Sequence, residues 1–315
     1  MNYRRLGRAG VKLSEISLGS WLTYGAAVEE KGAIACIERA YDLGVNFFDT
    51  ANAYARGRAE EVVGKALKCY RRDSFVLATK AYWPMGEGPN DRGLSRKHLF
   101  EQIHASLKRL GTDYVDIFWC HRYDPESPLE ETLRTLDDFV RQGKVLYVGT
   151  SMWRAAQIVD GLRLQQRLNM YRFSCEQPEY SMLHRAIEAE VMPLCEREGV
   201  GICPFSPLAQ GVLTGKYKVG AKPPKGTRAA DPSAGRFMRD RLLPENLRRV
   251  EKLKPIAKRN GLTLAQLALA WCLRKPIVAS VIIGATRPEQ VEENVKASGV
   301  AIPTEDLEKI EKVLT

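Results

Sequence analysis

The sequence predicts an α/β protein in which eight parallel strands, alternating with helices, close into a (β/α)8 TIM barrel. Short apolar runs rich in Val, Ile and Phe alternate with longer segments whose apolar residues recur about every 3.6 positions. Eight such runs occur, which is the number of strands in that barrel. The main alternative is an open doubly wound sheet, but no G-x-G-x-x-G motif follows the first run.

Each predicted strand is one of these short apolar runs. In chain order they are ISLGSW (16–21), NFFDTA (46–51), SFVLATK (74–80), DIFWCH (116–121), VLYVGTS (145–151), FSCEQ (173–177), GICPFSPL (201–208) and ASVIIGA (279–285). Ahead of them, YRRLGRAGVKLS predicts a short hairpin with its turn at Gly7 to Gly10, expected to cap the barrel floor.

The segments between the runs have helical apolar spacing. They include EEKGAIACIERAYDLG (29–44), SRKHLFEQIHASLKRLG (95–111) and LEETLRTLDDFVRQG (129–143), each ending in a Gly that can serve as a C-cap. The stretch from Lys218 to Pro244 is rich in Gly, Pro, Lys and Arg, and predicts a long loop after the seventh strand. Because such a loop lies at the barrel mouth, we interpret it as a lid or clamp.

Size and composition favour a single barrel domain over residues 1–315, although two domains are also allowed. The 315 residues are 44% hydrophobic, enough for a large core. No apolar run approaches the roughly 20 residues that span a bilayer, and MNYRRLGRAG lacks the apolar segment of a signal peptide. We therefore expect a soluble cytoplasmic protein with no membrane partner.

Cysteine, histidine and charge patterns argue against other classes. The seven cysteines are scattered and form no C-x-x-C pair, so we expect reduced, mostly buried thiols and neither a disulfide framework nor a zinc site. His98 and His104 are six residues apart on a predicted helix and face different sides, so no metal is expected. The net charge of +10 is spread without aromatic interleaving, which favours a solvated basic surface over a nucleic-acid partner.

Four residues that can carry proton chemistry follow neighbouring strands. Asp49, Lys80 and His121 stand at or near the ends of predicted strands two, three and four, and Tyr54 lies in the next loop after Asp49. In a parallel barrel these strand ends converge on one face. Taken singly, each has an ordinary explanation as a helix cap, a polar strand end or a packed aromatic. Together, the four complementary groups favour a site.

The four residue types suit proton donation to a carbonyl. A tyrosine hydroxyl, with a pKa of about 10, needs a nearby cation that favours its anion, and Lys80 can supply one. A buried lysine needs a carboxylate to stay charged, which Asp49 provides. His121 would orient the carbonyl or relay a proton. Cys120 and His121 point to opposite faces of a strand and form no dyad, so the other half of the reaction requires a hydride-donating cofactor.

Two later segments suit a dinucleotide. PFSPLAQGVLTGKY (204–217) leaves strand seven through small residues, so its backbone N–H groups could approach a pyrophosphate beside Lys216. IIGATRPEQVEENV (282–295) ends strand eight at Gly284 and enters a helix, the usual phosphate site of a barrel. Gln290, Glu293 and Asn294 could contact an adenine edge. An ordinary amphipathic helix start remains the alternative.

These motifs together resemble the aldo-keto reductase superfamily, and within it the branch of potassium-channel β subunits and related bacterial reductases. The resemblance covers nearly the whole chain. It rests on YRRLGRAGVKLSEISLGSW, FDTANAY, GLSRKHLFEQIHASLKRLGTDYVDIFWCHRYDP, GKVLYVGTSMW, CEQPEY, FSPLAQGVLTGKY and IIGATRPEQVEEN.

The resemblance implies a catalytic tetrad of Asp49, Tyr54, Lys80 and His121, with Tyr54 as the general acid. It also implies NADPH/NADP+ bound across the barrel mouth. The nicotinamide side would involve Ser20, Trp21, Asp49, Ser151, Gln177 and Phe205; the pyrophosphate, Ser206, Leu208, Gln210 and Lys216; the 2′-phosphate, Arg228 and Thr286; and the adenine end, Gln290, Glu293 and Asn294, with Gly284 also near the cofactor.

Two departures from the channel β subunits bear on function. Those subunits carry an asparagine where this chain has His121, which favours an active reductase. They carry an arginine where this chain has Met152, which puts one polar contact to the cofactor in question. The leading hypothesis is an NADP-dependent reductase of aldehydes or ketones, of the alcohol dehydrogenase/aldehyde reductase type. The alternative is an NADP(H)-binding, redox-sensing regulatory subunit of a partner protein, although no long segment for docking precedes the barrel.

The substrate pocket is expected to favour a small aromatic or polar carbonyl compound. Its predicted lining is Trp21, Tyr24, Tyr54, Trp83, Arg122 and Tyr123. Arg122 would either bind a phosphate or carboxylate of the substrate or pair with Asp124. A homo-oligomer is compatible with the resemblance, which does not decide the oligomeric state.

Overall fold

A computed structural model describes residues 1–21, 24, 29–231 and 235–315, and its main feature is one eight-stranded parallel sheet. The strands are β3 (Ile16–Gly19), β4 (Phe47–Asp49), β5 (Val76–Ala81), β6 (Val115–Cys120), β7 (Val145–Ser151), β8 (Phe173–Gln177), β9 (Gly201–Ile202) and β10 (Val281–Ile283). Their order in the sheet is β10-β3-β4-β5-β6-β7-β8-β9. Each of the eight predicted apolar runs overlaps one of these strands.

The sheet closes on itself between β9 and β10. Parallel bridges join Ile202 to Val278 and Phe205 to Ile282. The N–H of Ile282 donates to the carbonyl oxygen of Pro204 at 2.9 Å. This bond continues the pairing of the two edge segments toward the barrel mouth. The predicted closed barrel is therefore confirmed.

The seventh strand is much shorter than predicted. The sequence predicted residues 201–208, but β9 contains only Gly201 and Ile202. Pro204 and Pro207 have no backbone N–H to donate to a neighbouring strand, so the ladder stops and only isolated bridges at Phe205 continue it.

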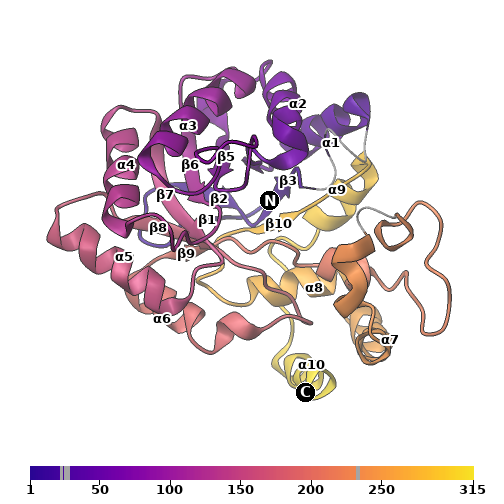
Figure 1. The fold of residues 1–315 in the computed structure, drawn as a ribbon. Helices are drawn as coiled ribbons and strands as arrows, with labels where there is room; N and C mark the ends of the chain where they lie inside the picture. Colours follow the sequence, from indigo (N-terminus) through magenta and orange to yellow (C-terminus); the bar gives the residue numbers. More distant parts are fainter. Residues whose placement is uncertain (22–23, 25–28, 232–234) are drawn as a thin grey trace.

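Helices surround the strands (Figure 1). They are α1 (Glu30–Asp42), α2 (Arg58–Leu67), α3 (Arg96–Leu110), α4 (Leu129–Arg141), α5 (Ala155–Arg167), α6 (Val191–Glu198), α7 (Pro244–Arg259), α8 (Leu264–Leu273), α9 (Pro288–Val295) and α10 (Thr304–Leu314). The helices predicted at 29–44, 95–111 and 129–143 are confirmed as α1, α3 and α4. Gly44, Gly111 and Gly143 adopt positive φ angles of 84°, 66° and 70° just after them, as glycine caps do.

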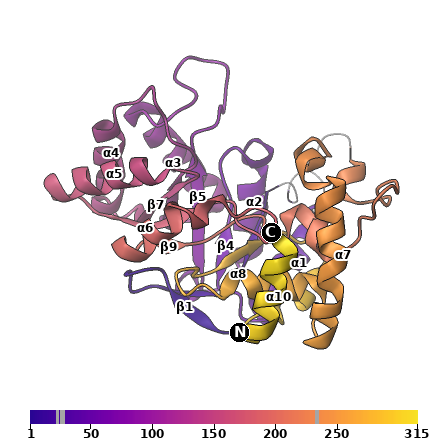
Figure 2. The ribbon, with the colours of Figure 1, turned by 90° about the horizontal axis from the view of Figure 1, so that it is seen from below.

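The N-terminal hairpin closes the floor of the barrel. β1 (Tyr3–Arg5) pairs antiparallel with β2 (Lys12–Ser14), and Gly7 in the turn has a φ of 57°. Leu6 and Leu13 are fully buried in a cluster that also contains the barrel-interior residues Phe47, Ile117 and Trp119. In Figure 2 the hairpin lies beside the label β1, at one end of the strands.

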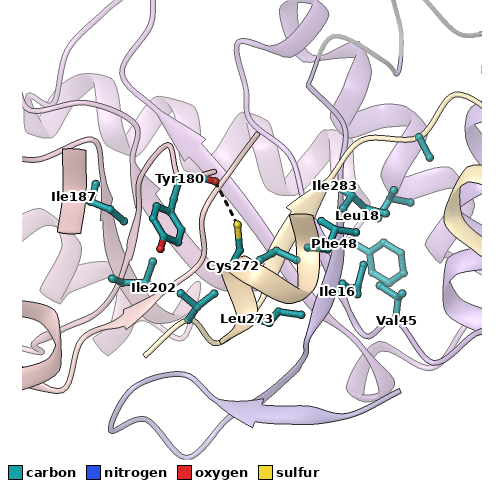
Figure 3. Close-up of a cluster of buried hydrophobic side chains, with 14 of the residues drawn as sticks. Ile16, Leu18, Val45, Phe48, Tyr180, Ile187, Ile202, Cys272, Leu273 and Ile283 are labelled. Carbon is teal, nitrogen blue, oxygen red and sulfur yellow. Dashed lines mark hydrogen bonds between the residues drawn. The ribbon is translucent and has the colours of Figure 1, made fainter. Parts of the chain in front are cut away.

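A second, larger core fills the space between strands and helices. Figure 3 shows Ile16, Leu18, Phe48 and Ile283 on one side of α8 and Tyr180 and Ile187 on the other, all within one buried cluster. In α8 every residue after Leu264 is buried. The thiol of Cys272 donates to the main-chain oxygen of Tyr180, at 3.9 Å (Figure 3).

The long segment from Lys218 to Pro244 follows β9, as predicted, but it is not structureless. It contains the short 3₁₀ helices η5 (Arg228–Ala230) and η6 (Gly235–Arg241), while its residues 232–234 lie outside the described part of the chain. Arg241 forms an ion pair with Glu179, in the loop after β8. A role as lid or clamp stays a prediction.

All seven cysteines are free thiols, and only Cys69 is exposed. Across the described ranges, no helix is both long and apolar enough to cross a bilayer.

Candidate active site

Four neighbouring elements bring the predicted proton-chemistry residues to the C-terminal end of the barrel. Asp49 is the last residue of β4, Lys80 is the fifth residue of β5, and His121 directly follows β6. Tyr54 opens the short helix η1 (Tyr54–Gly57) after β4. β4, β5 and β6 are adjacent in the sheet, so the chain topology alone groups these side chains.

Asp49 and Lys80 form a buried ion pair. The Lys80 ammonium donates to Asp49 Oδ2 and, at 2.8 Å, to the main-chain oxygen of Thr50. The Lys80 side chain is 0% exposed and the Asp49 side chain 4% exposed. Burial lowers the pKa of Lys80, and the carboxylate of Asp49 opposes that shift. The pair therefore holds one positive and one negative charge in place under the barrel mouth.

The ring of Tyr54 lies between Lys80 and His121. Lys80 Nζ is 5.0 Å from the Tyr54 ring centroid, and the Tyr54 and His121 ring centroids are 5.6 Å apart at an interplanar angle of 76°. The pKa of Tyr54 is raised well above its usual value, first by burial and then by Asp49. The cation that opposes this shift is Arg122, not the predicted Lys80, and it does not prevail because removal from water penalises the phenolate more strongly. The hydroxyl is therefore protonated at neutral pH.

His121 is neutral at physiological pH. Burial is the largest cause that lowers its pKa well below the usual value, followed by the positive charges of Lys80 and Arg122. Its Nδ1 atom is buried and has no hydrogen-bond partner among the described residues. A neutral imidazole can donate one N–H to a carbonyl oxygen, and a buried ring nitrogen without a partner is unusual outside functional sites.

The residues predicted for the nicotinamide side gather around Asp49. Gln177 Nε2 donates to Asp49 Oδ1 at 3.0 Å, and the Ser20 N–H donates to the Asp49 main-chain oxygen, also at 3.0 Å. The Ser151 hydroxyl donates to the main-chain oxygen of Gln177 at 2.8 Å. Nearby, Trp21 and Phe205 meet edge to face with ring centroids 6.4 Å apart.

The loop after β9 has an unusual backbone where the pyrophosphate was predicted. Ser206, Ala209 and Gln210 have φ angles of 54°, 46° and 56°, a left-handed conformation that costs free energy for residues other than glycine. Gln210 is buried, and its Oε1 has no hydrogen-bond partner in the described chain. Leu208, which was predicted to line the same site, is half-buried in this loop. Strain together with a buried amide oxygen that lacks a partner is typical of a ligand-binding loop.

Three basic residues from separate segments form a cationic cluster, defined here as Lys216, Arg228 and Arg287. The pKa of Lys216 is lowered, first by burial of part of its side chain and then by the charges of the two arginines. Lys216 and Arg228 were expected at the cofactor, whereas Arg287 was not. Arg287 is the N-cap residue of α9, and its Nε atom lies 3.7 Å from Glu289 Oε2. A basic residue at the start of a predicted phosphate-binding helix was the available signal.

The N-terminus of α9 is partly occupied by its own side chains. Gln290 Oε1 accepts from the Thr286 N–H at 2.9 Å and from its hydroxyl at 3.3 Å. The main-chain oxygen of Glu293 accepts a hydrogen bond from Gln266 Nε2 at 3.0 Å. Asn294 is buried and Gly284 is exposed. The geometry fits an ordinary helix start as well as an adenine contact, so the adenine roles stay predictions.

Of the six predicted substrate-pocket residues, Trp21 and Tyr54 are described above, and the other four divide into two groups. Trp83, 41% exposed, and Arg122 lie beside His121. Tyr24 is only 2% exposed and belongs to the hydrophobic core, and Tyr123 packs against Trp153 with ring centroids 4.9 Å apart.

The predicted alternative, that Arg122 pairs with Asp124, is wrong. Asp124 accepts hydrogen bonds from the N–H groups of Leu94 and Glu126 and from the Ser127 hydroxyl, at 2.7, 3.0 and 2.7 Å. Two of these bonds lie within the loop after β6 and the third joins it to the loop after β5, so the carboxylate is already engaged.

No cluster of metal ligands accompanies the site: within the described ranges, no three His, Cys, Asp or Glu side chains gather in a way that could hold a metal ion. A cavity of about 370 Å³ lies elsewhere, at the N-terminal ends of β7 and β8, lined in part by Arg8, Leu146 and Tyr171. It faces away from Asp49 and is not the candidate site.

Comparison with known proteins finds a family match over nearly the whole chain. The sequence model of the Aldo/keto reductase family matches residues 15–315. A protein of Arabidopsis thaliana described as a probable voltage-gated potassium channel subunit beta is 47% identical over 100% of this chain and 97% of its own length. A rice (Oryza sativa subsp. japonica) protein of the same description is 45% identical over the same shares. A Schizosaccharomyces pombe protein described as a putative subunit of that kind is 41% identical over 99% of this chain and 93% of its own length.

Proposed function

The chain belongs to the aldo/keto reductase family, and from that premise we propose that it is an NADPH-dependent oxidoreductase that reduces small aldehydes or ketones to alcohols. The observation that carries this proposal is the buried Lys80–Asp49 ion pair beneath Tyr54 and His121. All four groups can ionise, and burial keeps Tyr54 protonated and His121 neutral beside the charged pair. A cytoplasmic location belongs to the same proposal.

Each of the four residues would have one role in the reaction. Tyr54 holds its proton at neutral pH, because burial raises its pKa, and releases it to the carbonyl oxygen as that oxygen gains negative charge. Lys80, held charged by Asp49, stabilises the phenolate that remains. His121, neutral because burial lowers its pKa, donates an N–H to the same oxygen and orients the carbonyl.

The residues present fit a nicotinamide dinucleotide with an extra phosphate. The bound cofactor would supply the hydride that no side chain can provide. Trp21 and Phe205 offer aromatic surface for a ring, and Ser151 and Gln177 offer amide-binding groups. The left-handed backbone of the loop after β9 suits a pyrophosphate, because backbone N–H groups in such a turn can bind an anion. The cationic cluster suits a 2′-phosphate.

Single-turnover oxidation of bound NADPH by a panel of small aldehydes tests the proposal directly. We expect rapid loss of NADPH absorbance with at least one aldehyde, and an alcohol as product. Tight NADPH binding with negligible oxidation by every aldehyde and ketone would contradict it.

We also expect NADPH to bind at least about tenfold more tightly than NADH, because a charged hydrogen bond to the 2′-phosphate contributes about 1.5–3 kcal/mol. Arg228→Leu should remove most of that preference by weakening NADPH binding while sparing NADH. Lys222→Leu, at an exposed lysine of the same segment, is the matched control and should keep the preference. Fluorescence titration measures all six affinities, and equal affinities of the unmodified protein for NADPH and NADH would refute the 2′-phosphate site.

A second candidate is an NADP(H)-binding, redox-sensing subunit of a partner protein. The names of the three relatives favour it. It predicts very slow turnover together with a stable complex with another protein. His121, where the channel β subunits carry an asparagine, favours the reductase instead, and the single-turnover experiment separates the two.

A further inference from the structure

Arg122 is a cation at the barrel mouth that no residue in the described chain neutralises through an ion pair. It follows His121 directly and is half-buried. Its Nη1 atom donates to the His121 main-chain oxygen at 2.5 Å and approaches the Ser151 hydroxyl at 3.5 Å. The remaining N–H groups of the guanidinium have no hydrogen-bond partner within the described ranges. A guanidinium presents five donors in a planar fork, so most of its binding capacity is unused.

An aromatic surface lies beside this guanidinium. Arg122 Cζ is 5.5 Å from the Trp83 ring centroid, and the Trp83 and His121 ring centroids are 6.1 Å apart. The Trp83 side chain is 41% exposed. The cation, the aromatic face and the imidazole of the proposed catalytic group therefore share one small region.

Nearby carboxylates are committed elsewhere. Glu179 forms its ion pair with Arg241, and Asp124 accepts hydrogen bonds from its own loop and from the Leu94 N–H. Glu176 is fully buried, accepts from the Thr150 hydroxyl, and has a pKa raised to about 7 by burial, so it carries only part of a negative charge at neutral pH. Arg122 thus keeps most of its positive charge uncompensated.

Such an arrangement is unfavourable for stability alone. Burial lowers the pKa of Arg122 because the charge loses contact with water, yet a guanidinium does not deprotonate near neutral pH. A partly desolvated cation without a paired anion costs free energy. A bound anion would remove that cost, and one guanidinium matches the geometry and single charge of one carboxylate.

We propose that Arg122 is a specificity-determining residue that binds a carboxylate of the substrate, so that the protein favours small aldehydes carrying a carboxylate over neutral ones. This inference rests on the proposed reductase function. In it, the carbonyl lies against Tyr54 and His121, the carboxylate meets the fork of Arg122, and Trp83 covers the intervening part of the substrate.

The test compares 4-formylbenzoate with its uncharged methyl ester. In the unmodified protein, kcat/KM for the acid should exceed that for the ester. In Arg122→Leu this acid-to-ester ratio should fall by about 10- to 150-fold, the loss expected for a charged hydrogen-bonded contact. Arg122→Lys should fall between the two, because the charge remains and the fork is lost. Arg197→Leu, at an exposed arginine of α6, is the control and should leave the ratio unchanged.

Two results would overturn the inference. One is an acid-to-ester ratio that is the same in the unmodified protein and in Arg122→Leu. The other is an equal loss for both substrates, because that pattern means that Arg122 only supports the site's structure.

A binding measurement separates failure of this inference from failure of the reductase proposal. If no aldehyde is reduced, calorimetry of the NADP+-loaded protein with benzoate and with neutral benzamide still tests Arg122. Benzoate binding that is lost in Arg122→Leu while the variant still binds NADP+ would support the anion subsite without catalysis. Absence of benzoate binding to the unmodified, NADP+-loaded protein would refute it.

Discussion

Replacing Tyr54 with phenylalanine should lower the single-turnover rate of aldehyde reduction by about 10²- to 10⁴-fold and leave NADPH affinity nearly unchanged. The substitution keeps the ring that lies 5.0 Å from Lys80 Nζ and against His121, and removes only the hydroxyl. A loss in chemistry without a loss in binding is expected when an interaction forms only in the transition state.

The measurement pairs stopped-flow oxidation of NADPH with fluorescence titration of NADPH. Tyr41→Phe is a suitable control, because it removes a hydroxyl that donates to Ser74 on the protein surface. That control should reduce aldehydes at the unmodified rate. If Tyr54→Phe did so as well, Tyr54 would not be the proton donor.

Lys80→Met should lower the free energy of unfolding by about 3–5 kcal/mol, the range for breaking a buried ion pair by removing one partner. The substitution leaves Asp49 with a buried negative charge, compensated only by the hydrogen bonds of its neighbours. The loss should be visible in denaturant unfolding and as a lower thermal midpoint. Aldehyde reduction should fall too, because the phenolate of Tyr54 loses the cation that lies 5.0 Å from its ring centroid.

A double variant separates the ion pair from simple loss of packing. Lys80→Met combined with Asp49→Asn removes both charges and should recover a large part of the lost stability. The matched surface control is Lys65→Met, which breaks an ion pair with Glu30 whose side chains are 64% and 35% exposed. That control should cost less than about 1 kcal/mol. A Lys80→Met protein as stable as the unmodified one would show that the pair does not carry the expected energy.

Most of the barrel could be predicted because its signals are local. The strands predicted at 145–151 and 173–177 coincide with β7 and β8, since a buried parallel strand is a short apolar run bounded by turns. The prediction made the seventh strand too long, because Pro204 and Pro207 interrupt the hydrogen bonding that an apolar run suggests. The helix and hairpin turns followed from Gly7, Gly44 and Gly111, which adopt positive φ angles.

The grouping of the candidate catalytic residues was also predictable. Asp49, Lys80 and His121 stand at the ends of consecutive strands, and in a closed parallel barrel those ends meet on one face. Residue order was therefore enough to bring them together, with Tyr54 following in the next loop. Their catalytic roles remain proposals that the variants above test.

Charge state and partner choice could not be predicted in the same way. The charge states that the sequence did not reveal are the protonated phenol of Tyr54 and the uncompensated charge of Arg122. The interactions that it did not reveal are the hydrogen bonds of Asp124 with its own loop and the approach of Arg287 to Lys216. Each depends on which groups lie within a few ångströms after folding and on how much water each one loses. Strand order follows from local apolar patterns along the chain, whereas electrostatics follows from distances across it, and only the folded barrel sets those distances.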